Sequence, residues 1–342
     1  MSLSMDIGPL RLRSGALLPP VQVAYTCRGT LAPAGDNAIL VTHGFTSAHT
    51  MIEAGHLVAE GSWADLVGPG RPLDTDRHVV VCSNMLGSAF GTTGPGSIDP
   101  ATGRPWGPDF PDITLADIVE VQHRLLHALG VTRLRAVIGP SYGGFQALQW
   151  ALDHPDRVDA IGVISSDFRS PPGQGKAQQI ARLAASPQWH GGRYHDHGGM
   201  AQTLEGLRRQ TLQAYGLERL HAARGLTPEQ SRARIDAACR QWAGQFDANS
   251  LPVLAGAAEH FDVRDRVHEI RARVLMVQTT TDAIFPAAAA SRELLARVPA
   301  PTRYVALDSP YGHMAAGVEA ARWSHEIAWL LADATQSPEA TR

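Results

Sequence analysis

The 342-residue sequence has little of what several classes of protein require. Its cysteines are Cys27, Cys82 and Cys239, an odd and widely spaced set that excludes a disulfide framework and a CxxC metal site. Lysine and arginine total 30 against 33 aspartates and glutamates, so no basic excess is available to bind nucleic acid. No apolar run reaches the roughly 18 residues that a membrane span needs. We therefore predict a cytoplasmic protein with reduced thiols and no nucleic-acid or membrane partner.

The composition is that of a globular protein, with 44% apolar and 18% charged residues. Helical periodicity appears over Thr114–Leu129 and Gly143–Leu152. Short apolar runs rich in valine and isoleucine are typical of strands buried on both faces. These predicted strands are Ala38–Thr42, His78–Cys82, Leu134–Gly139, Ala160–Ile164, Val274–Gln278 and Arg303–Leu307. Strands that alternate with helices predict an α/β fold, with a mostly parallel central sheet and helices on both faces.

The alternation breaks between Phe168 and Asp262, where the periodicity is helical throughout. We predict a helical cap at 168–262, inserted into a core formed by 1–167 and 263–342. A cap over the strand ends is well placed to enclose a substrate. Within it, Thr227 is predicted to begin a helix as N-cap, with Gln230 at the third position. A last helix is predicted over Val318–Ala332.

The sharpest motif follows the strand at Leu134–Gly139 and begins the next helix. It reads Gly139-Pro140-Ser141-Tyr142-Gly143-Gly144. A GxSxG sequence between a strand and a helix is the context of a nucleophile elbow, where small neighbours allow a tight turn. The serine is then exposed at the carboxyl edge of the sheet, beside a helix N-terminus that favours negative charge. We predict that Ser141 is a catalytic nucleophile on an α/β-hydrolase fold; the alternative is a glycine-rich turn with an ordinary serine.

A serine hydroxyl needs a base, and in α/β-hydrolases the chain order is serine, acid, histidine. His313 lies beyond the last predicted strand and is the predicted base. Asp282 follows the strand at Val274–Gln278 and is the predicted acid, which would hold the imidazole tautomer. The alternatives are a solvated loop histidine and a turn aspartate, and Asp262 and Asp308 are weaker acid candidates.

An oxyanion hole needs two backbone N–H donors, for which we predict Phe45 and Tyr142. His43 is expected to be structural. The bulky rings of Tyr142 and Phe145 favour small acyl groups. The histidines of Trp189–His197 lack a completing acid or thiol cluster, so no metal is predicted.

Several segments together resemble the homoserine O-acetyltransferase family of α/β-hydrolase-fold proteins. They are Asp74–Pro111, the elbow with Gln146-Ala147-Leu148, Pro187–Gly192 and Phe246–Ser250. The resemblance implies an acyl-serine mechanism on Ser141, Asp282 and His313, and a homodimer joined through the cap helices.

Two positions bear on the acceptor. Family members usually carry an aspartate after the catalytic histidine, which would hold the amino group of homoserine, whereas this chain has Met314. A family arginine that would meet the homoserine carboxylate corresponds to Arg208, with Arg209 adjacent. We therefore predict a carboxylesterase for small short-chain acyl esters that needs no cofactor. The alternatives are an O-acetyltransferase for homoserine or a related alcohol, with acetyl-CoA as co-substrate, and a non-enzymatic binding protein.

Overall fold

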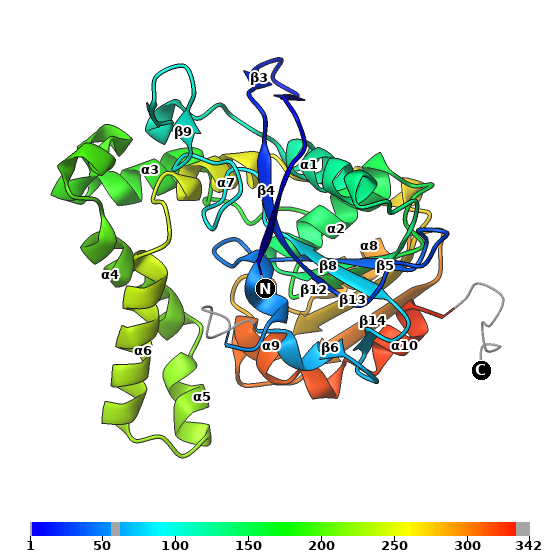
Figure 1. The fold of residues 1–342 in the computed structure, drawn as a ribbon. Helices are drawn as coiled ribbons and strands as arrows, with labels where there is room; N and C mark the ends of the chain where they lie inside the picture. Colours follow the sequence, from blue (N-terminus) through cyan, green and yellow to red (C-terminus); the bar gives the residue numbers. More distant parts are fainter. Residues whose placement is uncertain (1, 56–61, 333–342) are drawn as a thin grey trace.

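A computed structural model describes residues 2–55 and 62–332 of the chain. Its centre is an eight-stranded sheet in the order β1-β4-β8-β5-β11-β12-β13-β14 (Figure 1). The first two strands pair antiparallel, and the other six are parallel to one another. The bounds are β1 Leu3–Asp6, β4 Gln22–Arg28, β5 Ala38–Thr42, β8 Val79–Ser83, β11 Leu134–Pro140, β12 Ala160–Ile164, β13 Arg273–Thr279 and β14 Thr302–Leu307. The predicted mostly parallel sheet is confirmed.

All six predicted strands are present, each with ends within one residue of the prediction. The sequence analysis missed β1 and β4 at the antiparallel edge. In β4, polar residues interrupt the apolar run, and one of them, Thr26, is fully buried because its hydroxyl donates to the carbonyl of His49 at 2.7 Å. Short two-stranded ribbons lie outside the main sheet. They are β2 Leu10–Arg11 with β3 Leu17–Leu18, β6 Val67–Gly68 with β7 Leu73–Asp74, and β9 Ile98–Asp99 with β10 Arg104–Pro105.

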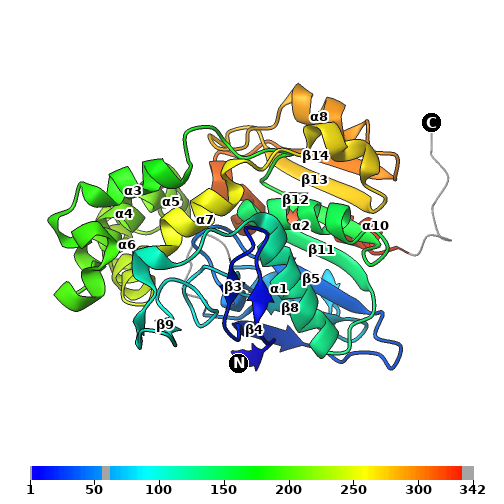
Figure 2. The same cartoon turned by 90° about the horizontal axis from the view of Figure 1, so that it is seen from above.

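Helices cover both faces of the sheet, as predicted. On one face lie α1 (Leu115–Ala128), α2 (Tyr142–Asp153) and α8 (Ala289–Leu295), and their apolar sides form one large core with the strands. The other face carries α9 (Ala315–Val318) and α10 (Glu326–Leu330) (Figures 1 and 2). No helix within the described ranges combines the length and apolar character needed to cross a bilayer.

The single C-terminal helix predicted over Val318–Ala332 is wrong. The segment is instead broken into α9, a 3-10 turn at Ala320–Arg322, and α10. The break lets Trp323 turn fully inward, where its indole N–H donates to the carbonyl of Ala316 at 2.9 Å and its ring lies 5.9 Å from that of Trp63. A continuous helix would have pointed this large side chain along a different direction.

Helices fill the chain between β12 and β13. They are α3 Lys176–Ala184, α4 Ala201–Ala214, α5 Leu217–Ala223, α6 Pro228–Ala243 and α7 Ser250–Glu259. The base of this segment is closed by an antiparallel bridge between Arg169 and Asp262. Helices α4, α5 and α6 stand to one side of the sheet, whereas α7 packs into the main core (Figure 1). The predicted start of α6 is confirmed, since Thr227 and Gln230 form a reciprocal capping box.

Candidate active site

Ser141 lies in a tight turn between β11 and α2. Its backbone has φ 56° and ψ −123°, a conformation that is unusual for a residue with a side chain and is found in strained strand-to-helix elbows. The flanking glycines are needed because β5 runs close by. A Cβ on Gly139 would lie 2.1 Å from Thr42 Oγ1, and one on Gly143 would lie 2.3 Å from the carbonyl oxygen of Thr42. The local sequence therefore holds the serine at the carboxyl edge of the sheet.

The predicted acid and base meet at the same edge. Asp282 follows β13, and His313 lies in a 3-10 turn at Gly312–Met314 after β14. His313 Nδ1 is 2.8 Å from Asp282 Oδ2. Thr281 ties the two loops together, because its hydroxyl donates to the carbonyl of Ser309 at 2.5 Å and accepts the N–H of Gly312 at 3.1 Å.

The surroundings of Asp282 keep its carboxylate ionised. Burial by itself would raise the pKa of this side chain, which is shielded from solvent. The hydrogen bond and charge of His313 act in the opposite direction. The backbone N–H groups of Ile284 and Phe285 also donate to Asp282 Oδ1, at 2.8 and 3.2 Å. Together these contacts hold the pKa of Asp282 below its usual value, so the carboxylate can orient and stabilise an imidazolium.

Phe45 and Tyr142 flank Ser141 from two different elements. Phe45 follows β5, the strand next to β11, and lines the cavity that contains Ser141. Tyr142 is the first residue of α2, where a backbone N–H has no partner within the helix. Neither Tyr142 nor Phe145 is among the residues that line the cavity, so their rings give no support to the expectation of small acyl groups. The Tyr142 hydroxyl donates to the carbonyl of Leu254, and Phe145 is buried against Phe261.

His43 is held in the interior by backbone contacts. Its Nδ1 is 2.9 Å from the carbonyl oxygen of Gly44, and its Nε2 accepts the N–H of Met85 at 3.3 Å. These contacts place the proton on Nδ1 and occupy both ring nitrogens. His43 therefore braces the loop that carries Phe45.

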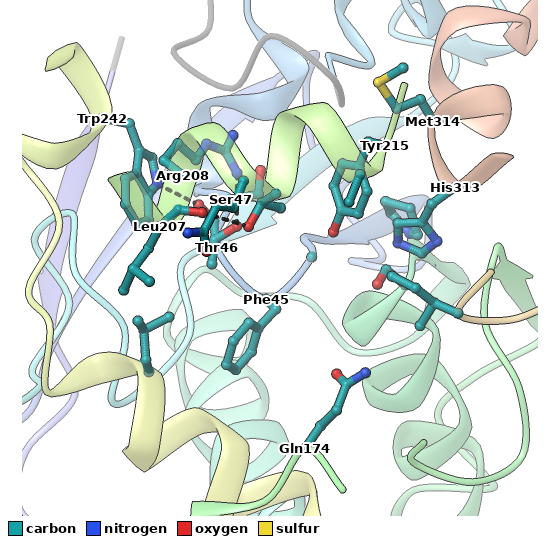
Figure 3. Close-up of a pocket in the computed structure, with 18 of the residues that line it drawn as sticks. Phe45, Thr46, Ser47, Gln174, Leu207, Arg208, Tyr215, Trp242, His313 and Met314 are labelled. Atoms are coloured by element: carbon teal, nitrogen blue, oxygen red, sulfur yellow. Dashed lines mark hydrogen bonds between the residues drawn. The ribbon is translucent and has the colours of Figure 1, made fainter. Parts of the chain in front are cut away.

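A cavity of about 600 Å³ lies between the strand ends and the helices of the cap segment, and both Ser141 and His313 line it. Figure 3 shows His313 across this cavity from Arg208. Helix α4 supplies a large part of its wall. Arg208 of α4 faces the cavity and is only 3% exposed. Its guanidinium lies 5.2 Å from the ring centroid of Trp242, and its Nη1 donates to Thr46 Oγ1 at 3.2 Å. The adjacent Arg209 instead pairs with Asp236 of α6, so of these two neighbours Arg208 is the one that faces the cavity. Arg182 of α3 also lines the cavity, and its guanidinium donates to Gln210 Oε1 at 3.2 Å.

Met314 also lines the cavity and is nearly fully buried. It packs in an apolar cluster with Leu212 of α4 and Cys239 of α6. Arg208 and Met314 therefore lie in the wall of one cavity although they are far apart in the sequence. Among its described lining residues there is no aspartate or glutamate.

The sequence analysis missed several residues of the cavity wall. Trp242 donates its indole N–H to the carbonyl of Thr46 at 3.0 Å and thereby joins α6 to the loop after β5. Tyr215 ends α4 and lies against the base, with its ring 5.2 Å from that of His313. A signal for Tyr215 was present, because it follows Arg208 by seven residues and so lies on nearly the same face of α4.

Comparisons with known proteins identify the family of the chain. Residues 37–320 match the family described as alpha/beta hydrolase fold. The chain is 37% identical to a homoserine O-acetyltransferase of Gluconobacter oxydans (strain 621H), over 97% of this chain and 92% of that protein. A homoserine O-acetyltransferase structure from Bacillus anthracis aligns with a TM-score of 0.82 and 25% identity, covering 99% of each chain. Esterase E22 aligns with a TM-score of 0.84 and 25% identity, over 97% of this chain and 100% of the esterase. The chain thus belongs to the homoserine O-acetyltransferase family, whose members are acyl-transferring enzymes of the α/β-hydrolase fold.

Proposed function

We propose that the protein is an O-acyltransferase that moves a short acyl group from acyl-CoA to an alcohol bearing a carboxylate, with homoserine as the reference acceptor. This reverses the order of the two enzymatic hypotheses from the sequence. The observation that carries the proposal is the place of Arg208 in the same cavity as Ser141 and His313. A guanidinium can bind a carboxylate through two parallel hydrogen bonds, a recognition that simple acetyl esters do not need. The family relationship supports the same conclusion.

In the first half-reaction, Ser141 Oγ attacks the thioester carbonyl while His313 accepts the serine proton. The backbone N–H groups of Phe45 and Tyr142 stabilise the oxyanion. The tetrahedral intermediate collapses, the C–S bond breaks, and His313 donates the proton to the leaving CoA thiolate. In the second half-reaction His313 takes the proton of the acceptor hydroxyl, whose oxygen attacks the acyl-serine. Breaking the bond to Ser141 Oγ releases the new ester, and His313 returns the proton to the serine.

A second candidate function is hydrolysis of short-chain acyl esters, and Met314 is the observation that favours it. Its thioether cannot pair with an ammonium group, and the described cavity wall contains no carboxylate to replace it. Weak acceptor binding would leave water to attack the acyl-serine. The structural likeness to esterase E22 is compatible with this activity.

The two functions are separated by measuring thiol release from acetyl-CoA with L-homoserine, with 4-hydroxybutyrate, and with neither acceptor. The proposal expects release to rise at least about 10-fold with either acceptor, since both carry the carboxylate that Arg208 binds. The same sample is assayed for p-nitrophenyl acetate hydrolysis. Rapid hydrolysis of that ester, with thiol release indifferent to both alcohols, would establish the esterase instead.

Replacing Arg208 by glutamine is expected to raise KM for the acceptor about 10- to 100-fold, because the carboxylate loses a charged, bidentate partner. Hydrolysis of p-nitrophenyl acetate, which has no carboxylate, should change less than about 3-fold. Arg209→Gln is the matched control, since that side chain pairs with Asp236. Equal losses in the two assays, or in the two variants, would show that Arg208 does not recognise the acceptor.

Replacing Met314 by aspartate is expected to increase kcat/KM for L-homoserine relative to 4-hydroxybutyrate by about 10²-fold, because the new carboxylate can pair with the ammonium group. Met314→Asn has nearly the same shape without the charge and is the control. Both variants are compared in initial-rate assays on the same preparation of acetyl-CoA. An unchanged ratio for Met314→Asp would mean that this position does not face the acceptor nitrogen.

A further inference from the structure

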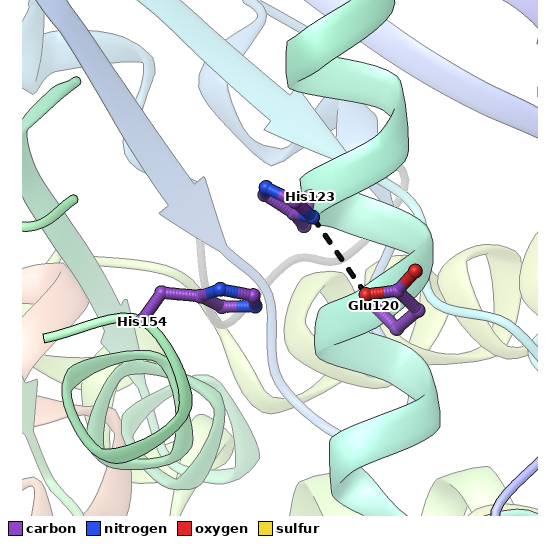
Figure 4. A group of neighbouring side chains, drawn as sticks. All are labelled: Glu120, His123 and His154. Atoms are coloured by element: carbon purple, nitrogen blue, oxygen red, sulfur yellow. Dashed lines mark ion pairs between the residues drawn. The ribbon is translucent and has the colours of Figure 1, made fainter. Parts of the chain in front are cut away.

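Three potential metal ligands meet outside the cavity, on the outer side of α1 and α2. Glu120 and His123 belong to α1, and His154 is the residue that ends α2. Their ligand atoms all lie within 4.8 Å of one another (Figure 4). Within residues 2–55 and 62–332, this is the group of three or more histidines, cysteines or acids with such spacing. The sequence analysis did not find it, because His154 is separated from the other two by a strand and a helix.

Helix geometry and packing hold the three residues in place. Glu120 and His123 are three positions apart, so they project from the same face of α1. A buried hydrogen-bond chain fixes α2 against α1: Gln122 Nε2 donates to Gln146 Oε1 at 2.6 Å, and Trp150 Nε1 donates to Gln122 Oε1 at 2.7 Å. The group therefore exists in the fold without help from a ligand.

The histidine in the middle of the group lacks hydrogen bonds of its own. Both ring nitrogens of His123 are shielded from solvent and neither has a hydrogen-bond partner. His123 is in ion-pair contact with Glu120, since its Nδ1 lies 3.6 Å from Glu120 Oε2. Buried polar atoms without partners are costly, and metal coordination is one way to satisfy them.

The Glu120 carboxylate is oriented by a hydrogen bond from a neighbouring side chain, as metal-binding carboxylates usually are. Arg124 Nε donates to Glu120 Oε1 at 2.7 Å, which orients the group and leaves Oε2 on the side of His123. The rings of His123 and His154 stack at 4.4 Å with an interplanar angle of 24°. Since the lone pairs of stacked rings run parallel, one ring must turn to share an ion with the other.

We propose that Glu120, His123 and His154 form a Zn²⁺ site that links α1 to the end of α2. Two imidazoles and one carboxylate are a ligand set that zinc accepts, with water in the fourth position. Because Arg124 touches the carboxylate and the ring must turn, we expect a dissociation constant of about 1–100 μM rather than the tight binding of a closed structural site. A bound ion would fasten the helix whose first turn follows Ser141.

The test is isothermal titration of the untagged protein with ZnCl2, together with melting curves at increasing ZnCl2. The wild-type chain should bind one Zn²⁺ that is lost or weakened at least about 10-fold in both His123→Gln and His154→Gln. Its melting temperature should rise with ZnCl2, and this rise should disappear in the two variants. His127→Gln is the matched control, since it removes an exposed histidine one turn further along α1.

Esterase or transferase activity without zinc should be the same in these variants and in the wild type, which shows that they fold. Absence of zinc binding by the wild-type chain would overturn the proposal. So would binding that both variants retain, because the ion would then sit among other histidines.

Discussion

Replacing Ser141 by alanine is expected to lower kcat for acyl transfer by about 10⁴-fold or more, because the covalent path through the acyl-serine is removed. The melting temperature should change little, since the substitution deletes one hydroxyl in the wall of a cavity. The measurement is thiol release from acetyl-CoA and hydrolysis of p-nitrophenyl acetate, with both rates compared with the wild type.

The covalent step can also be seen directly. After a brief incubation with acetyl donor and acid quench, the wild-type peptide containing Ser141 should gain about 42 Da, the mass of an acetyl group in place of a proton. Ser166→Ala is the control, because Ser166 is a buried serine beside Gly144 that does not line the cavity. An alanine variant at Ser141 that still turns over acyl donor at the wild-type rate would refute the serine mechanism.

Replacing Asp282 by asparagine is expected to lower kcat by about 10⁴-fold, because the amide favours the wrong tautomer of His313 and cannot stabilise the imidazolium. The loss should be similar for acyl transfer and for ester hydrolysis, since both half-reactions use the same base. Asparagine is nearly isosteric and its oxygen can still accept the N–H groups of Ile284 and Phe285, so the loop should keep its shape.

Asp308→Asn and Asp262→Asn are the matched controls, because these aspartates are the other candidate acids in the sequence. In the structure Asp262 pairs with Arg264, and Asp308 Oδ1 lies 3.4 Å from Thr280 Oγ1. Both variants should keep wild-type kcat within about 3-fold. A larger loss at either control than at Asp282 would show that Asp282 is not the acid of the triad.

The sheet could be predicted because its central strands are short apolar runs covered on both faces. The order of residues in the sequence is enough to reveal such runs, and their ends agree with the ends of the strands to within one residue. Strand β4, which lies between β1 and β8, could not be found in this way, since a tertiary hydrogen bond satisfies its buried Thr26. The break in the C-terminal helix could not be predicted for a similar reason, because the direction in which Trp323 is buried depends on Trp63, which is far away in the chain.

The site residues at the strand ends could be predicted from the sequence because the topology of the sheet places them. Ser141, Asp282 and His313 each follow a strand of one parallel array, so their side chains reach the same edge of the sheet. The residues that the cap helices contribute to the cavity wall could not be predicted in the same way. Which helix face meets the cavity depends on packing of α4 against α6, so the sequence named Arg208 only through the family resemblance, with Arg209 adjacent. The structure separates the two, because Arg208 lines the cavity and Arg209 pairs with Asp236.

The account depends most on the claim that a hydroxyl acceptor, rather than water, receives the acyl group from Ser141. The most direct test supplies acetyl-CoA and L-homoserine together and quantifies O-acetylhomoserine and free acetate in the same reaction by mass spectrometry. The account predicts that the acetylated alcohol forms at least about 10-fold faster than acetate at saturating acceptor. Acetate as the sole product, at any homoserine concentration, would contradict it and identify the enzyme as a hydrolase.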